Sequence, residues 1–477
     1  MGKAATNNFT NRTKGEKMKR WTALIAVVLL AAVAASSRDQ LTRTMGVGRD
    51  VDNILTQRRQ AEVVNEYVSW RLDNILPEIL RREGIDLWLV ICFEYDEDPV
   101  FMALTTRPRM SARRLSILMF HDAPDGFRKL TASWHGSGAA GPMYTNIFTP
   151  EYRNKGANAQ FTAVADYIRK NNPKKIGINY AEHWEYHDDF SHGLGLSAFH
   201  KAKLEQALDP EHKARLVSAE KVCIGWYETR SPMELSLYRH LAGIGHNLIE
   251  EFFSNQVITP DVTTADDVQW WYRERLAKLG LTAWFQPSID IRRSPAGAAK
   301  YPKDDRVIRR GDLLHCDVGF RYLDLCTDMQ HNAYVLMPGE SDAPQGLKDL
   351  LRKGHRLQEI LLSEMKEGRK GNEILVSALG KAKAEGIEGS IYSHPIGYYG
   401  HGSGMMLGMV EKQNFVPGTG EHPLYPNSSY SIELSVSHTV PEWGNARASM
   451  GLEDEALFTK EGARWADGYP ARLYLIR

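Results

Sequence analysis

Four acidic side chains in the C-terminal half of the chain interrupt segments that are otherwise apolar. They are Asp317 in "LLHCDVGF", Asp328 in "DLCTDMQHNAYVL", Glu433 in "YSIELSV" and Glu453 in "MGLEDEALF". Burying an unpaired carboxylate costs several kcal/mol, so each of these segments needs a partner for its charge. Taken singly, each acid is explained by a salt bridge or a strand edge. Taken together, the four indicate one shared site.

A shared carboxylate site of this kind predicts bound cations. Asp317 and Asp328 lie on two predicted strands joined by a short turn, so they can face one another across a hairpin. If Glu433 and Glu453 converge there too, divalent ions relieve the repulsion among the four negative charges. His401 lies between glycines in "GHGSG", where the backbone can approach closely, and is the candidate imidazole ligand. Such a ligand set suits two ions of Mn, Co, Fe or Zn.

Two domains are expected to position these residues. The apolar spacing in 61–85 predicts a helix, and the continuous apolar run "DLWLVICF" that follows predicts a buried strand. Predicted strands at 115–120 and 174–180 alternate with helices at 161–171 and 200–208, which favours an α/β domain over 61–227. Ser231 and Thr264 are predicted helix N-caps, and strands with two further helices, 344–366 and 371–385, follow. We assign 38–60 to a flexible lead-in and 228–477 to the catalytic domain.

The charge balance and the N-terminal segment indicate which partners and which cellular compartment to expect. The chain has 59 basic and 59 acidic residues among 477, which gives no support for nucleic acid or an anionic membrane surface as a partner. Residues 18–37, "MKRWTALIAVVLLAAVAASS", have the order of an export signal, with basic residues, a short apolar core and Ala32-Val33-Ala34. The apolar core is shorter than the roughly 20 residues of a membrane span. We predict that 1–37 is an N-terminal extension with an export signal, so that the protein is periplasmic or secreted, or else a retained anchor.

The four cysteines, Cys92, Cys223, Cys316 and Cys326, form no CxxC pair. This argues against zinc-ribbon or thioredoxin chemistry. Cys316 and Cys326 lie in adjacent predicted strands and could approach each other. Buried free thiols are nevertheless the favoured interpretation.

These motifs resemble the pita-bread metallopeptidases, which include Xaa-Pro aminopeptidases, prolidases, methionine aminopeptidases and the metal-free creatinase. The resemblance is closest to the two-domain, proline-specific and creatinase-like branch and covers most of the chain after residue 60. Family members carry Asp-x-Gly and a second Asp eleven residues after the first, as "DVGFRYLDLCTD" does. The metal ligands that the resemblance implies are Asp317, Asp328, His401, Glu433 and Glu453. The implied architecture is an α/β N-terminal domain followed by an α+β pita-bread domain.

The resemblance also implies an activity. Two divalent ions, with manganese favoured, would bridge a water and lower its pKa so that hydroxide forms and attacks a peptide carbonyl. Glu433 matches the glutamate that shuttles a proton to the leaving amine. The expected protein is an exported Xaa-Pro aminopeptidase-like hydrolase that cleaves short peptides or a related amide. A homodimer is implied as well.

Two histidines of the family pattern are replaced in this sequence. Lys300 stands 17 residues before Asp317, and Gly408 stands seven residues after His401, where the family has histidines that orient substrate and stabilise transition-state charge. The spacing also indicates a lengthened histidine loop, because His394 precedes His401 by seven residues where the family usually has four. These departures leave the strength of the peptidase activity open.

Four residues are candidate substitutes for the missing histidines. His315 lies two residues before Asp317 and hence on the same face of a regular strand. Lys300 offers a cation to an oxyanion, and His331 and His394 are further candidates. Gln330 and His331 also stand where the family usually has Thr-Arg. Two alternatives to the peptidase remain: a pita-bread protein that binds a ligand without hydrolysing it, and a creatinase-like amidinohydrolase that acts without metal.

Overall fold

The computed structural model describes residues 42–43, 49–135, 141–182 and 195–477. The chain divides into one unit of 1–47 with 468–471 and a second unit of 48–467 with 472–477. In the first unit, β1 (Thr42–Arg43) pairs in parallel with β21 (Tyr469–Pro470). The predicted export or anchor segment, 18–37, lies outside the described residues. Within those residues, no helix combines the length and the apolar character needed to cross a membrane.

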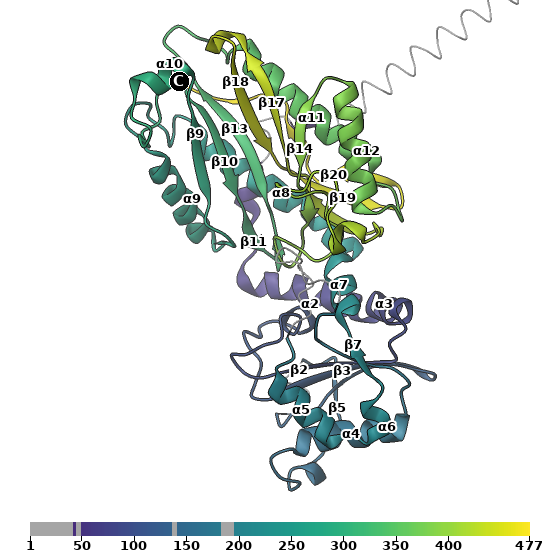
Figure 1. Ribbon diagram of the computed structural model, residues 1–477. Coiled ribbons are helices and arrows are strands. Elements are labelled where there is room, and N and C mark those ends of the chain that lie inside the picture. The colour runs from purple at the N-terminus through teal and green to yellow at the C-terminus, as the bar shows by residue number, and fades with distance from the viewer. Residues whose placement is uncertain (1–41, 44–48, 136–140, 183–194) are drawn as a thin grey trace, which may run out of the picture. The chain divides into compact units, whose positions relative to one another are not determined.

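The N-terminal part of the second unit is built on a six-stranded mixed sheet of order β5-β4-β3-β2-β6-β7 (Figure 1). Its strands are β2 (Leu87–Cys92), β3 (Ser116–Ala123), β4 (Gly126–Thr131), β5 (Thr145–Asn146), β6 (Ile176–Ile178) and β7 (Leu216–Ser218). The helices are α4 (Ala159–Asn171), α5 (Ala198–Ala207), α6 (Pro210–Lys213) and α7 (Glu220–Glu228). Strand β2 is buried along its whole length, as its continuous apolar sequence predicts.

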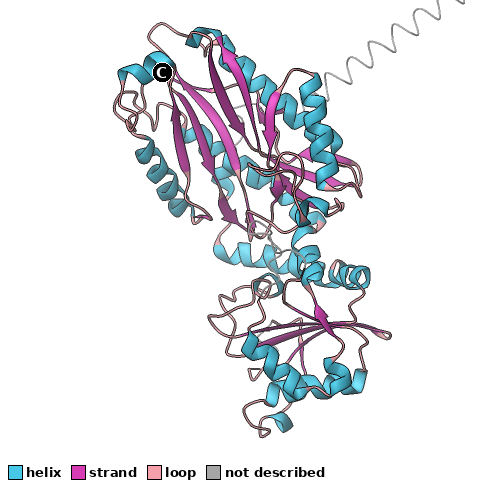
Figure 2. Ribbon diagram, in the orientation of Figure 1, coloured by secondary structure: helices cyan, strands magenta, loops and turns pink. Residues whose placement is uncertain are grey.

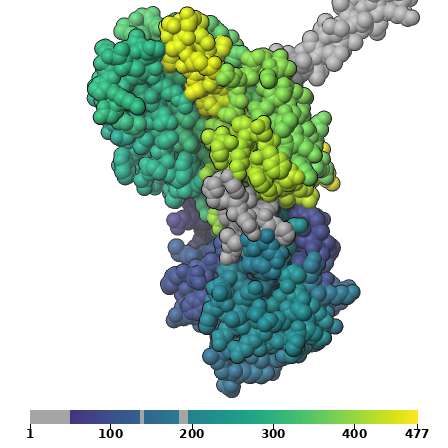
Figure 3. Space-filling model, in the orientation of Figure 1, coloured from purple at the N-terminus to yellow at the C-terminus, as the bar shows by residue number. Residues whose placement is uncertain are grey.

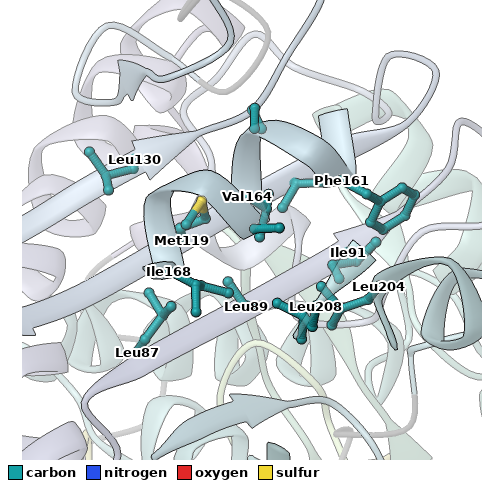
Figure 4. Packing of buried hydrophobic residues seen from close by; sticks show 14 of the residues in the cluster. Leu87, Leu89, Ile91, Met119, Leu130, Phe161, Val164, Ile168, Leu204 and Leu208 are labelled. Atoms are coloured by element: carbon teal, nitrogen blue, oxygen red, sulfur yellow. The ribbon is translucent and has the colours of Figure 1, made fainter. Parts of the chain in front are cut away.

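The core of this part lies between the sheet and α4 and α5. Leu87, Leu89 and Ile91 point from β2 toward Phe161, Val164 and Ile168 of α4, with Leu204 of α5 beside them (Figure 4). All of these side chains are buried. Burial of such aliphatic side chains contributes about 1.5–3 kcal/mol each, so this layer stabilises the α/β fold.

The first helices of the described chain differ from the prediction. The segment 61–85, expected as one helix, forms α2 (Gln57–Asn74) and α3 (Leu76–Glu83), which break at Ile75 next to Pro77 because proline cannot continue the preceding helix. The expected flexible lead-in, 38–60, contains a 3₁₀ helix, η1 (Asp50–Asn53), and the first turn of α2. Asp50 Oδ1 lies 2.9 Å from His240 Nδ1, so η1 is tied to the second domain.

The C-terminal part begins with two capped helices. In α8 (Pro232–Phe252) and α9 (Ala265–Leu279), the predicted N-caps Ser231 and Thr264 form capping boxes with Glu234 and Asp267. The remaining helices are α10 (Pro295–Lys300), α11 (Gln345–Glu364) and α12 (Gly371–Ala384). Short 3₁₀ helices are η2 (Met102–Leu104), η4 (Pro150–Tyr152), η5 (Gly418–Glu421) and η6 (Pro441–Trp443).

Four small sheets fill the C-terminal part. The first contains β22 (Tyr474–Ile476), β13 (Met329–Val335), β10 (Leu313–Val318) and β9 (Ser288–Arg292). The second contains β14 (Glu388–Ile391), β17 (Leu434–Val440) and β18 (Ala446–Leu452). The third contains β15 (His394–Pro395), β16 (Ser428–Ser431), β19 (Glu455–Thr459) and β20 (Gly462–Trp465), and the fourth β12 (Leu325–Cys326), β11 (Phe320–Tyr322) and β8 (Thr282–Ala283).

Helices flank these sheets from outside, with α9 beside β9 and with α11 against β17 and β18 (Figure 2). On the surface, the yellow-green to yellow C-terminal segments lie against the green segments that include α11 and α12 (Figure 3). Strands thus form the interior of this part, where side chains from different sheets can meet. All four cysteines are buried and free, in agreement with the favoured interpretation.

Candidate metal centre

The four acids singled out in the sequence come together at the junction of three sheets. Asp317 in β10 is the cross-strand partner of Gln330 in β13, and Asp328 immediately precedes β13. An antiparallel β-bridge then joins Gln330 to Glu453, which lies between β18 and β19. Carboxylate oxygens of Asp317, Asp328 and Glu453 lie within 4.8 Å of one another. The hairpin and the bridge therefore bring acids from distant parts of the sequence to one point.

His394, the first residue of β15, contributes an imidazole to this cluster. Its Nε2 atom lies 3.4 Å from Glu453 Oε1, 3.8 Å from Asp328 Oδ2 and 3.9 Å from Glu433 Oε2. The ring is buried, and the pairing of His394 with Ser431 in β16 fixes its backbone. The structure thus puts His394, predicted as a substitute catalytic residue, among the carboxylates.

The hydrogen bonding of His394 shows what the cluster can hold. Nδ1 lies 2.9 Å from the carbonyl oxygen of Pro395, which can only accept, so Nδ1 carries the proton and a neutral ring has its lone pair on Nε2. His394 Nε2 and Asp328 Oδ1 are buried atoms without a hydrogen-bond partner. A divalent cation satisfies these lone pairs together, and a backbone carbonyl on the other ring nitrogen is the usual support of a metal-binding histidine. The residues present therefore fit a metal ion.

Burial and mutual repulsion raise the pKa values of three of these acids. Burial, and next the charge of Glu453, raise the pKa of Asp317 to about 8. The same two causes raise the pKa of Asp328 and of Glu433 well above the usual range of carboxyl groups. Acids that resist ionisation in the metal-free protein are the expected result of several carboxylates sharing one buried site.

His401, the predicted imidazole ligand, lies at the edge of the cluster. Its side chain is exposed, and its ring lies 4.8 Å from the ring of His394 and 5.2 Å from that of Trp284. It offers a nitrogen within 4.8 Å of ligand atoms of Asp328 and His394, so it also borders the proposed metal position. Gly400 lets this loop approach, because a Cβ there would lie 2.2 Å from the Trp284 ring.

In the structure, the imidazole among the acids is His394, seven residues before the predicted ligand His401. Gly408, where the resemblance implies a second histidine, is buried at φ +79°, and a Cβ there would lie 2.1 Å from the carbonyl oxygen of Ile391. No side chain fits at that position. With His394 taken as the central imidazole, the histidine seven residues further on is His401. This separation equals the seven residues that the resemblance implies between the liganding histidine and the one that follows it.

Gln330 and Ser431 contact the acids and were not predicted as site residues. The side-chain amide of Gln330 donates to Glu433 Oε1 and, at 2.8 Å, to Glu453 Oε2. Ser431 Oγ donates to Glu453 Oε1 at 2.5 Å. The alternation of side chains along a strand puts Gln330 on the same face as Asp328, two residues earlier, and this signal could have identified it.

The other candidate substitutes are distributed differently. His315 is buried, and its Nε2 lies 3.0 Å from Gln330 Oε1, so it contacts the site through Gln330. Lys300 is exposed at the end of α10, with its ammonium 4.9 Å from the centre of the Tyr301 ring. Among the described residues, no hydrogen bond or ion pair joins Lys300 to the four acids, so the structure does not bring this candidate to the site.

His331 belongs to a second buried cluster, because the alternation of β13 turns it away from the face that carries Gln330. Nε2 of His331 and Nε2 of His246 each lie 2.9 Å from Asp454 Oδ1. On their other nitrogens, His331 lies 3.2 Å from the Tyr474 hydroxyl and His246 lies 3.1 Å from Asp467 Oδ2. Although burial opposes ionisation, the two histidines lower the pKa of Asp454 to about 2. Hydrogen-bond distances throughout make this cluster a buried hydrogen-bonded network, and its ligand atoms also lie close enough together to hold a metal ion.

Comparison with known proteins places this arrangement in a family. Residues 236–467 match the sequence model of metallopeptidase family M24. The "Uncharacterized peptidase YqhT" of Bacillus subtilis is 25% identical over 175 residues, which are 36% of this chain and 44% of that protein. The chain therefore matches less than half the length of this curated relative.

Solved structures extend the likeness to most of the chain. The X-Pro aminopeptidase from Thermotoga maritima superposes with a TM-score of 0.57 at 15% identity, over 83% of this chain and 99% of that one. The Xaa-Pro dipeptidase from Bacillus anthracis gives 0.55 at 16% identity, over 88% and 100%. At these identities the likeness shows the fold.

The fold defines the class: this is a two-domain protein with an α/β N-terminal part and a pita-bread C-terminal part, so the predicted architecture and the resemblance are confirmed. Within its C-terminal part, residues 236–467 match the model of metallopeptidase family M24. Members of that family are hydrolases that generally use divalent metal ions.

Proposed function

We propose that this chain is an exported, metal-dependent hydrolase of the Xaa-Pro aminopeptidase type, which cleaves short peptides with two divalent ions. The ligands would be Asp317, Asp328, His394, Glu433 and Glu453, with His401 beside them. The observation that carries the proposal is the buried Nε2 of His394, which faces carboxylate oxygens of three acids while Nδ1 is held by Pro395. Manganese is favoured by the family resemblance.

The bound ions would supply Lewis acidity, polarising a substrate carbonyl and making a water molecule more acidic. The side chains of the chain divide the remaining tasks. Gln330 holds Glu433 Oε1, which leaves Oε2 directed toward His394 and able to move a proton to a leaving amine. His401 is exposed next to His394 and can donate a hydrogen bond to a substrate oxygen that gains negative charge.

The test combines metal analysis with hydrolysis of Xaa-Pro dipeptides and tripeptides by the wild type, Asp328→Ala and His394→Ala. We expect metal-dependent hydrolysis by the wild type and loss of both bound metal and activity in the two variants. Bound metal without hydrolysis of any peptide would indicate a binding protein instead. Turnover of a guanidino or amide compound by metal-free protein would indicate a creatinase-like amidinohydrolase.

Two further properties belong to this proposal. Export is supported by the signal-like order of residues 18–37 and is tested by N-terminal analysis of protein recovered from the periplasm or the medium. A homodimer is implied by the family resemblance and is tested by light scattering of the purified chain. A monomeric mass or an intact N-terminus in the cytoplasm would contradict the corresponding property.

A further inference from the structure

The amide of Gln330 uses all of its polar atoms next to the proposed metal centre. Its nitrogen donates to Glu433 Oε1 and Glu453 Oε2, and its oxygen lies 3.0 Å from His315 Nε2. Both Gln330 and His315 are buried, with 5% and 6% of their surface exposed. A single neutral side chain therefore links the two glutamates to one histidine.

The orientation of this amide is decided by its neighbours. Carboxylate oxygens only accept hydrogen bonds, so the NH₂ group must face the glutamates and the carbonyl oxygen must face His315. His315 Nε2 must then be the donor of that hydrogen bond. Without this donor, the carbonyl oxygen would be buried without a partner, and the amide would be held only through its nitrogen. His315 therefore anchors the end of Gln330 that is turned away from the acids.

Gly451 in β18 provides the space for this contact. A Cβ at position 451 would lie 2.7 Å from Gln330 Oε1 and 2.8 Å from His315 Nε2, which is closer than real Cβ atoms approach. The histidine, the amide and the glycine come from three different strands, β10, β13 and β18. The contact is thus built into the sheets rather than formed by a mobile surface chain.

We infer that His315 and Gln330 are a positioning pair that sets the separation of Glu433 and Glu453 and thereby the affinity of the site for metal. This inference rests on the proposed function, because it takes the two glutamates as ligands. An amide supplies two donors without a positive charge, so it orders the carboxylates without reducing their attraction for cations. Outer hydrogen bonds of this kind typically change metal affinity by about 10–100-fold.

The test measures Mn²⁺ binding to the metal-free full chain by calorimetry, and the visible spectrum of the Co²⁺-loaded chain. We expect His315→Leu and Gln330→Met each to weaken Mn²⁺ binding by about 10–100-fold and to alter the Co²⁺ spectrum. His315→Gln, whose amide nitrogen can donate in place of Nε2, is expected to stay within about threefold of the wild type. Gly451→Ala disturbs the same contact from the opposite side and should act like His315→Leu.

His121→Leu is the control, because His121 is another buried histidine that contacts a neutral side chain, with Nδ1 2.8 Å from the Tyr167 hydroxyl in the N-terminal part. His315 differs in that its Nδ1 also lies 3.5 Å from Asp290 Oδ2. Thermal unfolding in chelator checks that each variant folds. Wild-type affinity in both His315→Leu and Gly451→Ala would overturn the inference and leave the proposed function intact. Equal weakening by His121→Leu or by His315→Gln would also overturn it. A wild type that binds neither ion would overturn both.

Discussion

Replacing Asp328 by asparagine should stabilise the protein without metal and destabilise it, relative to the wild type, when metal is present. Asp328 is 4% exposed, its Oδ1 has no hydrogen-bond partner, and oxygens of Asp317 and Glu453 lie within 4.8 Å. Two unit charges about 4 Å apart repel by about 4 kcal/mol at an effective dielectric constant of about 20. Asparagine keeps the shape and removes the charge.

The sign follows from the protonation of the acids. Burial and the charge of Glu453 raise the pKa of Asp328 in the folded protein, so the folded state binds more protons than the unfolded chain. Stability of the metal-free wild type therefore falls as pH rises from the unfolded carboxyl pKa of about 4 through the folded value. The neighbouring Asp317, whose pKa is about 8, extends this window to weakly alkaline pH. We expect Asp328→Asn to add about 2 kcal/mol at pH 8, roughly half of the repulsion between two charges, and little at pH 5.

Denaturant unfolding measures the free energy of unfolding of both proteins, first in chelator and then in excess Mn²⁺. A ligand present at 100 times its dissociation constant stabilises a folded protein by about 2.7 kcal/mol. The wild type should gain this stability from Mn²⁺, and Asp328→Asn should not. The order of stability should therefore reverse when metal is added. Asp304→Asn, at an exposed acid, should change neither measurement. If Asp328→Asn is the less stable protein in chelator at pH 8, the repulsion argument fails.

Three further predictions concern other residues of the C-terminal part. Asp454→Asn should destabilise the folded protein by about 3–5 kcal/mol at pH 7, because it leaves two buried histidines without their shared carboxylate. In the wild type, the contribution of Asp454 to stability should be lost only as pH falls from about 4 toward the Asp454 pKa of about 2. An unchanged unfolding midpoint of the variant would contradict this. His401→Ala should lower kcat at least tenfold while calorimetry finds Mn²⁺ bound as in the wild type, whereas loss of metal would make His401 a ligand. Lys300→Met should leave peptide hydrolysis within about twofold, since the change is at an exposed residue away from the acids; a large loss would place Lys300 in catalysis.

The sequence indicated the architecture through patterns that act locally. Continuous apolar runs identified β2, and capping residues identified the starts of α8 and α9, because these signals depend on neighbours within one element. The break between α2 and α3 was missed, although Pro77 marks it, since the apolar spacing continues across the break. The acids of the site were found from the sequence because a charged side chain inside an apolar strand needs a partner, whatever the arrangement of the strands.

The histidine loop could not be assigned in the same way. Glycines around His401 suggested close backbone approach, and that approach exists, but it serves the packing of Gly400 against Trp284. Which imidazole reaches the acids depends on the pairing of His394 with Ser431, a contact between distant segments that no local pattern encodes. Gln330 was noted only as a departure from the family pattern, because its role appears once Glu433 and Glu453 are brought to it.

The bridge between Gln330 and Glu453 also has a consequence for how the chain folds. Two backbone hydrogen bonds of 3.0 and 3.1 Å hold the bridge. Glu453, its last residue, is followed directly by two further acids, Asp454 and Glu455. A slip of one residue that brought Asp454 into the place of Glu453, opposite His394, would bring Glu455 into the place of Asp454, opposite His246, because the whole segment moves together. Both faces would still receive a carboxylate, so charge alone would not reject the slipped register. The two registers then differ in side-chain length, because an aspartate, which is one methylene shorter than a glutamate, would stand opposite His394.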